Sequence, residues 1–213
     1  PYLFQKNGTL QFVYAGAMLP KAYQPLEELF KAISNNKPSF QNLEFHFIGT
    51  GSKPTDPESY NIKPLAEKYG LWKSIVNEYP KRIPYLDVLV HLKEADAVFI
   101  LGSTEPHYTP SKTYQAVLSQ KPIWAILNEK SSAAQILVTA KAATVLTFDG
   151  EEGVKQLALN FESSFNDFVD FKVNYNPKQV DLEKFDAYSA KNVTQHLVNL
   201  LNKLSEVTFF KIF

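Results

Sequence analysis

The chain has 213 residues, with 22 lysines and arginines against 22 aspartates and glutamates, so its formal net charge is zero. Binding to nucleic acid without sequence preference needs basic residues to neutralise phosphates, so nucleic acid is not expected as a partner. The sequence contains no cysteine, which excludes disulfides, thiolate catalysis and cysteine-based zinc sites. Its hydrophobic content of 45% is typical of a chain that folds around a core.

The sequence also bears on location and completeness. No apolar stretch approaches the roughly 18 residues needed to span a bilayer, and no signal peptide opens the chain, so we expect a cytoplasmic protein. The chain starts at Pro1 and its single methionine is Met18, which we interpret as a piece cut from a longer protein.

Strands are predicted by runs rich in β-branched and aromatic residues, and helices by apolar residues three and four positions apart. The stretch 163–181 shows neither pattern clearly. In chain order we expect a strand at 10–15, a helix at 25–33, a strand at 43–48, a helix at 62–69, a strand at 74–76, a helix at 85–94, a strand at 97–101, a helix at 109–119, a strand at 122–127, a helix at 133–140, a strand at 143–147, and helices at 151–161 and 185–204.

The alternation of strands and helices predicts an α/β fold: a doubly wound, mainly parallel sheet with helices on both faces. The runs at 97–101 and 122–127 are continuously apolar, as in strands buried on both faces. In such sheets ligands bind beyond the carboxyl ends of the strands, at the point where the strand order reverses. The loops that follow the strands are therefore where a site is expected.

Two glycine-containing loops are candidates. Gly16 follows the first strand and Lys21 comes shortly after it; a glycine lets backbone approach a ligand, and a lysine can pair with phosphate. The plain alternative is a turn glycine with a solvated lysine. Gly49 and Gly51 follow the second strand without the third glycine of a dinucleotide-binding fingerprint, which argues against NAD. They suit a turn facing a phosphate or sugar, or an ordinary strand-to-helix connection.

The strongest candidate is the segment 105–112, between a buried strand and a predicted helix. Thr109 is a favourable N-cap and Pro110 is favoured at the first helical position. The amides of Ser111 and Lys112 would then point outward at the positive end of the helix dipole, which is a site for an anion such as a diphosphate. The alternative is an ordinary capped helix.

The remaining polar residues give weaker signals. The four histidines show no metal-ligand spacing, so no metal is expected. His46 falls in mid-strand and is interpreted as a core residue, whereas His107 lies in the candidate loop. Glu105 follows a strand and has no evident acid–base partner in the sequence. Glu151 is expected to stand at a helix N-terminus.

Taken together, five segments in order resemble the donor-binding C-terminal half of a GT-B glycosyltransferase, similar to glycosyltransferase family 4. The resemblance runs from about residue 10 to about residue 150 and extends more weakly to the final helix. The segments are 12–16 with Lys21, 47–51, 92–97, 110–115 and 121–123.

The resemblance implies that this half holds a nucleotide-diphosphate sugar, which is a substrate, with no cofactor and no metal. Lys21 and Glu105 would act at the reacting sugar and its diphosphate. The donor-binding residues would be Gly16, Gly49, Gly51, Arg82, Ile83, His107, Thr109, Pro110, Ser111, Lys112 and Gln115. Arg82 and Ile83 fall where the family contacts the base, and Gln115 would lie near the ribose.

The sequence departs from the family at several of these positions. Ala17 stands where an arginine is usual, and Gln115 stands where the second of two glutamates is usual. The two glutamates of the family are separated by seven residues, and this spacing counted back from Gln115 reaches His107, not Glu105. Gln120 replaces the glycine that normally ends this helix. Since a glutamine cannot accept from two ribose hydroxyls as a carboxylate does, these changes affect donor binding.

The expected organisation is an inter-domain linker at 1–9, a Rossmann-like nucleotide-sugar-binding domain at 10–184, and a helix and tail at 185–213 that cross to a missing N-terminal domain. The apolar surface of that helix and the tail from Phe209 is expected to be exposed or self-paired. The implied enzyme is a metal-independent hexosyltransferase that builds a polysaccharide or glycolipid and is inactive without its other half.

The expected acceptor is a glycan or a lipid-linked sugar, and the resemblance allows peripheral membrane association of the full-length enzyme. Two alternatives stay open: a GT-B epimerase acting on a nucleotide sugar, and a degenerate Rossmann-like module that binds no nucleotide and serves protein contact.

Overall fold

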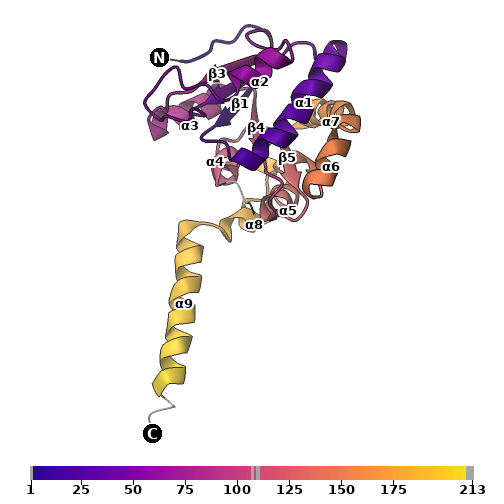
Figure 1. Ribbon diagram of the computed structural model, residues 1–213. Coiled ribbons are helices and arrows are strands. Elements are labelled where there is room, and N and C mark those ends of the chain that lie inside the picture. Colours follow the sequence, from indigo (N-terminus) through magenta and orange to yellow (C-terminus); the bar gives the residue numbers. More distant parts are fainter. Residues whose placement is uncertain (1, 107, 109–110, 210–213) are drawn as a thin grey trace.

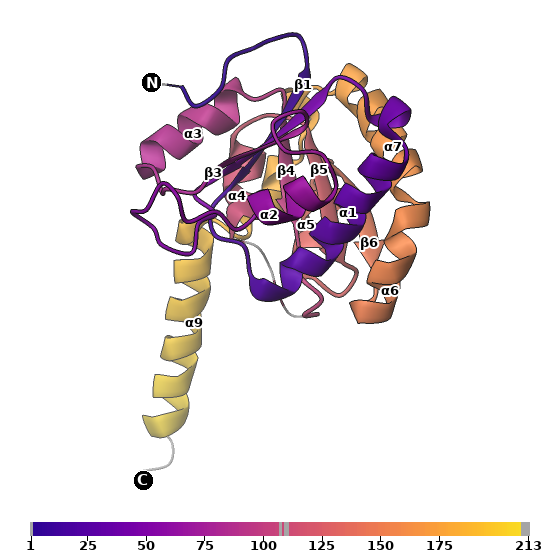
Figure 2. The same cartoon turned by 45° about the horizontal axis from the view of Figure 1, so that its top comes forward.

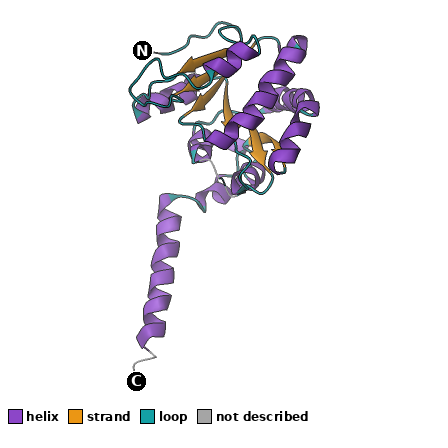
Figure 3. Cartoon of the chain, in the orientation of Figure 1, coloured by secondary structure: helices purple, strands orange, loops and turns teal. Residues whose placement is uncertain are grey.

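The computed structural model describes residues 2–106, 108 and 111–209, and their side chains as far as residue 204. Its centre is a six-stranded sheet with the order β3-β2-β1-β4-β5-β6, in which every neighbouring pair is parallel (Figures 1 and 3). The strands are β1 (Leu10–Ala15), β2 (Leu43–Ile48), β3 (Val76–Tyr79), β4 (Ala97–Leu101), β5 (Ile123–Asn128) and β6 (Ala143–Phe148).

Helices alternate with these strands along the chain. They are α1 (Tyr23–Asn35), α2 (Lys63–Lys68), α3 (Tyr85–Glu94), α4 (Lys112–Leu118), α5 (Ser132–Thr139), α6 (Gly150–Gln156), α7 (Phe161–Asn174), α8 (Leu182–Asp186) and α9 (Ala190–Phe209). Short 3₁₀ helices lie at Pro20–Ala22, Lys37–Phe40, Leu157–Leu159 and Pro177–Gln179. Within the described residues no helix has the length and hydrophobicity needed to cross a membrane.

The sheet is covered on both faces, as the alternation of side chains along each strand requires. In β1, Phe12 and Tyr14 belong to one apolar cluster and Val13 belongs to the other. The first cluster is completed by buried residues of α1, α2, α6 and α7, and the second by buried residues of α3, α4, α5 and α8. The predicted doubly wound α/β sheet is therefore confirmed.

Aromatic side chains fill the larger of the two cores. The Trp124 ring lies 5.7 Å from Phe99, 5.5 Å from Phe165 and 6.2 Å from Phe168, measured between ring centroids. Its indole nitrogen donates to Ser164 Oγ at 3.0 Å, so the one polar atom of this buried ring has a partner. Because Ser164, Phe165 and Phe168 all belong to α7, this helix closes the core over β5.

Most of α7 lies in the stretch 163–181, where the sequence shows no clear helix or strand pattern. The helix predicted at 151–161 is also wrong in its bounds, since α6 ends at Gln156 and α7 begins at Phe161 after a 3₁₀ turn. The buried apolar positions of α7 are phenylalanines at 161, 165 and 168, separated by charged and polar residues. Helical spacing was therefore present, but phenylalanine is a poor helix former and the polar residues between concealed it.

The third strand was predicted two residues too early. Lys73 has a φ of 63° and the Ile75 amide donates to the Leu71 carbonyl at 3.0 Å, so residues 74 and 75 belong to a turn. Pairing with β2 starts only at Val76, which lies opposite Phe45.

The final helix was predicted as one element from 185, and the structure shows two. The Tyr188 amide donates to the Phe185 carbonyl at 3.0 Å and the Ser189 amide to the Asp186 carbonyl at 2.8 Å, which ends α8 in a tight turn before α9 starts. Figures 1 and 2 both show α9 leading away from the sheet. The predicted exposure of its apolar surface is confirmed, while residues 210–213 of the tail lie outside the described residues.

The docking of α7 on the sheet can be tested by truncating one of its buried rings. Phe168→Ala should lower the free energy of unfolding by about 3–5 kcal/mol, because it leaves a cavity beside Trp124. Urea unfolding followed by circular dichroism measures the change. Val173→Ala, on an exposed position of the same helix, is the control and should change stability by less than about 0.5 kcal/mol. Equal effects of the two substitutions would contradict the placement of α7.

Candidate functional site

The order of strands fixes where a ligand is expected. The chain runs outward from β1 to β2 and β3, then returns to β4 beside β1 and continues to β5 and β6. The order therefore reverses between β1 and β4, and the loops that leave the carboxyl ends of these two strands diverge there. These are the loops that carry Gly16 with Lys21 and Glu105 with Lys112.

Lys112 joins the two loops. Its ammonium nitrogen lies 3.6 Å from the centre of the buried Tyr14 ring, and it donates to the Ala17 carbonyl at 3.3 Å. A methyl group placed on Gly16, whose φ is 102°, would stand 3.9 Å from that nitrogen. Lys112 and Ala17 are 95 residues apart in the sequence, and their loops thus meet at the switch point, where the strand order reverses.

The environment of this ammonium changes its acidity. Burial lowers the pKa of Lys112 from its ordinary value of 10.5 to about 7, because water around the charge is replaced by the aromatic ring and backbone. In the part of the chain that the structure describes, no carboxylate pairs with this nitrogen. A cation that is partly dehydrated and lacks a counter-charge favours binding of an anion.

Lys21 and Glu105, from the same two loops, form an ion pair. Lys21 Nζ lies 3.7 Å from Glu105 Oε1, and both side chains are about half exposed, at 55% and 49%. The Thr104 amide also donates to the Lys21 carbonyl, at 3.4 Å, so the two loops are in contact through backbone. Since an exposed ion pair contributes only about 0–1 kcal/mol, Lys21 can exchange Glu105 for a phosphate at little cost.

A second group of predicted residues lies beyond β2 and β3. Gly49 has a φ of 70°, and a methyl group placed on it would lie 3.7 Å from Arg82. The backbone amide of Gly51 donates to the Pro80 carbonyl at 3.0 Å, and the backbone amide of Arg82 donates to the Pro54 carbonyl at 2.8 Å. The Gly16 amide donates to the Ile48 carbonyl at 2.8 Å, so the turns that carry Gly16 and Gly49 start side by side.

Glu78 holds this second group in place, and nothing in the sequence pointed to it. The residue is 3% exposed, and its carboxylate accepts from Thr50 Oγ1 at 2.7 Å. It also accepts from the backbone amides of Asn61, Ile62 and Lys63 at 2.8–3.0 Å, where α2 begins. One buried carboxylate therefore ties the turn between Gly49 and Gly51 to the start of a helix.

Tyr14 is the other residue that sequence reasoning missed. It lies in the segment 12–16 but was given no role of its own, yet its ring lies under the Lys112 ammonium and its hydroxyl donates to the Ala17 carbonyl at 3.3 Å. Burial raises the pKa of the Tyr14 hydroxyl well above 10, so the ring stays neutral. A tyrosine two residues before a glycine turn was the available signal.

The remaining predicted residues are more scattered. Gln115 lies in α4, half-buried, and lines a groove of about 160 Å³. The other lining residues of that groove are Tyr85, Leu89, Lys93, Leu118 and Ser119. Ile83 packs against the second core cluster, so its side chain is engaged there.

The start of α4 differs from the prediction. The helix begins at Lys112, and Ser111 precedes it without a capping bond from its side chain. His107, Thr109 and Pro110 lie outside the described residues. The outward direction of the Ser111 and Lys112 amides stays a prediction.

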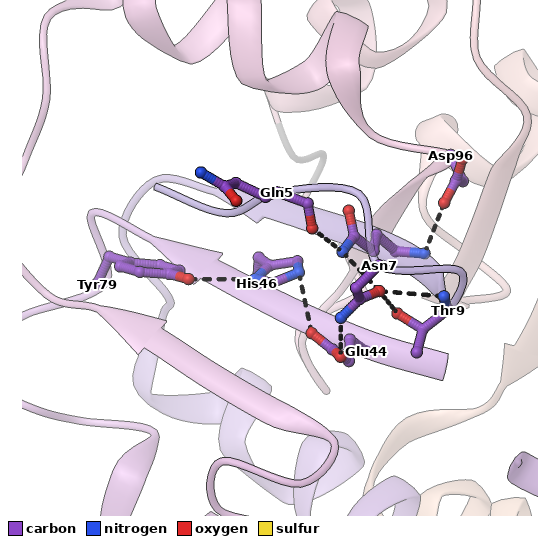
Figure 4. Close-up of polar contacts among 8 residues, drawn as sticks. Gln5, Asn7, Thr9, Glu44, His46, Tyr79 and Asp96 are labelled. Carbon is purple, nitrogen blue, oxygen red and sulfur yellow. Dashed lines mark hydrogen bonds and ion pairs between the residues drawn. The ribbon is translucent and has the colours of Figure 1, made fainter. Parts of the chain in front are cut away.

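The histidine in mid-strand is a core residue, as predicted. His46 is 2% exposed, and burial lowers its pKa to about 4, so it is neutral at pH 7. Figure 4 shows it between Tyr79, at 3.4 Å, and Glu44, whose other oxygen accepts from Asn7 at 2.7 Å. This network fixes the N-terminal segment to β2. Among the described residues, no group of acidic and histidine side chains is arranged to hold a metal ion.

No protein-family model and no curated protein matches the sequence. Solved structures do match the fold. They include the α,α-trehalose 6-phosphate synthase of Burkholderia multivorans, with a TM-score of 0.63 and 14% identity over 96% of this chain and 44% of the synthase. Anabaena Alr3699/HepE in complex with UDP-glucose has a TM-score of 0.62 and 15% identity, over 92% of this chain and 49% of HepE. TarM has a TM-score of 0.61 and 16% identity, over 95% and 36%.

The chain has the fold of one half of a GT-B glycosyltransferase. It spans less than half the length of each of these three proteins. At 14–16% identity the likeness concerns the fold, and membership of glycosyltransferase family 4 stays a prediction.

The pKa of Lys112 makes a testable contribution to stability. Lys112→Met should raise the free energy of unfolding more at about pH 6 than at about pH 9. In the folded chain the charged form is disfavoured, so its cost is present in full below the folded pKa of about 7. The cost falls as the pH rises from there toward the ordinary value of 10.5, because the folded protein sheds the proton that the unfolded chain keeps.

Thermal unfolding at the two pH values measures this difference. Lys178→Met, at an exposed lysine, is the matched control and should show the same effect at both. If Lys112→Met behaves in the same way as the control, the ammonium is not dehydrated.

Proposed function

We propose that this chain is the donor-binding half of a glycosyltransferase that moves a sugar from a nucleotide-diphosphate sugar to a glycan or lipid-linked acceptor. The observation that carries the proposal is Lys112, a partly buried ammonium without a carboxylate partner among the described residues, at the switch point of a GT-B half. Lys21, which follows Gly16 on the loop after β1, supplies a second cation.

The matched structures support a diphosphate as the ligand. Anabaena HepE has been solved with UDP-glucose, and Staphylococcus aureus MnaA, which has a TM-score of 0.55 and 14% identity to this chain, with UDP. Both proteins share the sheet whose carboxyl edge carries Lys112 in this chain. We infer that the diphosphate lies between Lys112 and Lys21, close to the Gly16 turn, where the absence of a side chain lets backbone approach it.

The chemistry that this arrangement serves is the breakage of the bond between the anomeric carbon and the diphosphate oxygen. The electron pair of that bond leaves with the diphosphate, while the acceptor oxygen forms a new bond to the anomeric carbon and loses its proton to a base. Positive charge at Lys112 and Lys21 stabilises the charge that develops on the diphosphate more than it stabilises the bound donor, which is what acceleration requires. Two lysines make a metal unnecessary in this proposal.

The other assignments follow the resemblance to the GT-B family. We infer that Arg82, which lies beside Gly49, contacts the nucleoside, and that Gln115, in the groove next to Tyr85, contacts the ribose. Glu105, paired to Lys21, lies toward the donor sugar. The base and the acceptor contacts come from residues outside this half, so the chain by itself is expected to bind donor without transferring sugar.

Donor binding can be tested by thermal unfolding with UDP, GDP and ADP. A ligand at 100 times its dissociation constant stabilises the folded state by about 2.7 kcal/mol, which corresponds to a shift of roughly 5–10 °C for a domain of this size. We expect one of the three nucleotides to give such a shift. The absence of a shift with all three would contradict the proposal and favour a module that binds no nucleotide.

The role of Lys112 is tested by the affinity for the matching nucleotide sugar at different pH values. Affinity should fall as the pH rises through about 7, since the ammonium loses its proton there and the diphosphate of a nucleotide sugar stays doubly charged. Lys112→Met should weaken binding by roughly 10–100-fold at pH 6, as expected for one charged hydrogen bond, and should flatten the pH profile.

Isothermal titration calorimetry measures both effects, and Lys178→Met should retain the wild-type profile. If Lys112→Met binds as tightly as the wild type, the diphosphate does not contact this lysine.

A further inference from the structure

The buried carboxylate of Glu78 is held without a counter-cation. Glu78 lies on β3, at the edge of the sheet, and is 3% exposed. Among the described residues, no lysine, arginine or histidine forms an ion pair with it. Its hydrogen bonds come instead from the backbone amides of residues 61–63 and from the Thr50 hydroxyl. A buried charge held only by neutral donors is a costly arrangement, and such arrangements are concentrated at functional sites.

Capping of α2 accounts for only part of these contacts. The N-cap position of α2 is Ile62, which offers no side-chain acceptor, so Glu78 supplies one from the neighbouring strand. A serine or aspartate at position 62 would do the same locally. A local cap would not bind Thr50, whose hydroxyl donates to Glu78 Oε1 at 2.7 Å. The contact that distinguishes Glu78 from a cap is therefore the one to the turn after β2.

The Thr50 turn is joined to the backbone of Arg82. Thr50 is 1% exposed, and its carbonyl accepts from the side-chain nitrogen of Asn61 at 2.7 Å, so both its polar groups are engaged. The loop 50–61 is thereby closed on itself. Within that loop the Pro54 carbonyl accepts from the backbone amide of Arg82 at 2.8 Å. A displacement of Thr50 is therefore passed on to Arg82.

Two glycines make this connection stiff. A methyl group placed on Gly51 would lie 2.8 Å from the Pro80 carbonyl oxygen, which is closer than a side chain tolerates. A methyl group placed on Gly49 would lie 3.7 Å from the Arg82 Cα. The turn after β2 and the segment after β3 are thus packed backbone against backbone, and they have little freedom to move separately.

We propose that Glu78 is a positioning residue that determines which nucleobase this half prefers, through the turn at Thr50 and the backbone at Arg82. The inference rests on the proposed function, in which Arg82 contacts the nucleoside. The edge of a base is read by hydrogen-bonding groups in fixed positions, and a displacement of about 0.5 Å weakens such contacts. Lys112 contacts Tyr14 and Ala17 on the loop after β1, so the diphosphate should be bound independently of Glu78.

The contact is best removed from the Thr50 side. Substitution of Glu78 would leave three backbone amides unpaired and destabilise the whole loop, whereas Thr50→Val removes one hydroxyl and keeps the branched shape. Isothermal titration calorimetry of the full chain with UDP, GDP, ADP and inorganic pyrophosphate, at about pH 6, measures the two parts of the ligand separately.

Thr50→Val should change nucleotide preference without changing diphosphate binding. The affinity for the tightest-bound nucleotide should fall by roughly tenfold, and its advantage over the other two should shrink accordingly. The affinity for pyrophosphate should stay within about twofold of the wild type, as expected for an independent site. A purely structural role of the contact would lower both affinities together.

Two variants serve as controls. Thr50→Ser keeps the hydroxyl and should keep the wild-type preference among the nucleotides, although it loses a buried methyl group. Lys112→Met should give the converse result, with weaker binding of pyrophosphate and of all three nucleotides alike and no change in preference. Thermal unfolding without ligand checks that each variant is folded.

The outcomes distinguish this inference from the proposed function. An unchanged preference in Thr50→Val, or an equal loss of pyrophosphate and nucleotide affinity, would overturn the role of Glu78 while nucleotide binding by the wild type still supports the proposed function. Loss of preference in Thr50→Ser, or a wild type that binds the three nucleotides equally, would overturn that role as well. A wild type that binds none of the four ligands would overturn the proposed function and the inference together.

Discussion

Burial removes part of the water around the ammonium of Lys112, at the start of α4. Its ammonium lies on the face of Tyr14 and against the Ala17 carbonyl, and both contacts come from the end of β1. Only the reversal of strand order brings β1 and β4 together, so the site exists because the sheet is wound in two directions from β1. A fold with the strands in sequential order would place β2 and β3 between β1 and β4 and so keep Lys112 away from Gly16.

The two cores make that arrangement rigid. Phe12 and Tyr14 point into the aromatic core, and Val13 between them points into the aliphatic core on the other face. The Tyr14 ring is therefore fixed by the packing of Phe47 and Phe99, at ring-centroid distances of 5.5 and 6.5 Å, before any ligand arrives. Glu78 does the same for the neighbouring turn, because its carboxylate binds three backbone amides and Thr50 at once. A site held by rigid elements loses little entropy on binding.

Local sequence patterns predict much of the fold, and the strands β4 and β5 show why. Strands β4 and β5 are continuous apolar runs because both of their faces are buried, and their predicted bounds agree with the structure to within one residue. The helix α7 was missed because its buried residues are phenylalanines among polar neighbours, and β3 was misplaced because Lys73 takes a left-handed backbone that no local preference favours. Tertiary packing decides both cases, and packing is not a local property.

The same reasoning explains why the site was only half visible in the sequence. Gly16, Lys21, Glu105 and Lys112 were each found from their place after a strand, yet their meeting depends on which strands are neighbours. Tyr14 and Glu78 were missed because a buried tyrosine and a buried glutamate look like ordinary strand residues until their partners are known.

The positions that depart from the family pattern can now be weighed one by one. At Ala17 the contact to Lys112 is made by the backbone carbonyl, so the loss of an arginine side chain leaves this interaction intact. At Gln120 the φ is 60°, so the chain keeps the left-handed turn that favours glycine although a glutamine occupies it. In both cases the backbone itself makes the contact or the turn, so the change of side chain does not remove it. The exception is Gln115, where the side chain itself would meet the ribose and an amide has fewer acceptor positions than a carboxylate. Under the proposed function, the consequences of divergence should therefore be concentrated in how the nucleoside is held, and the diphosphate contacts proposed for Lys112 should be spared.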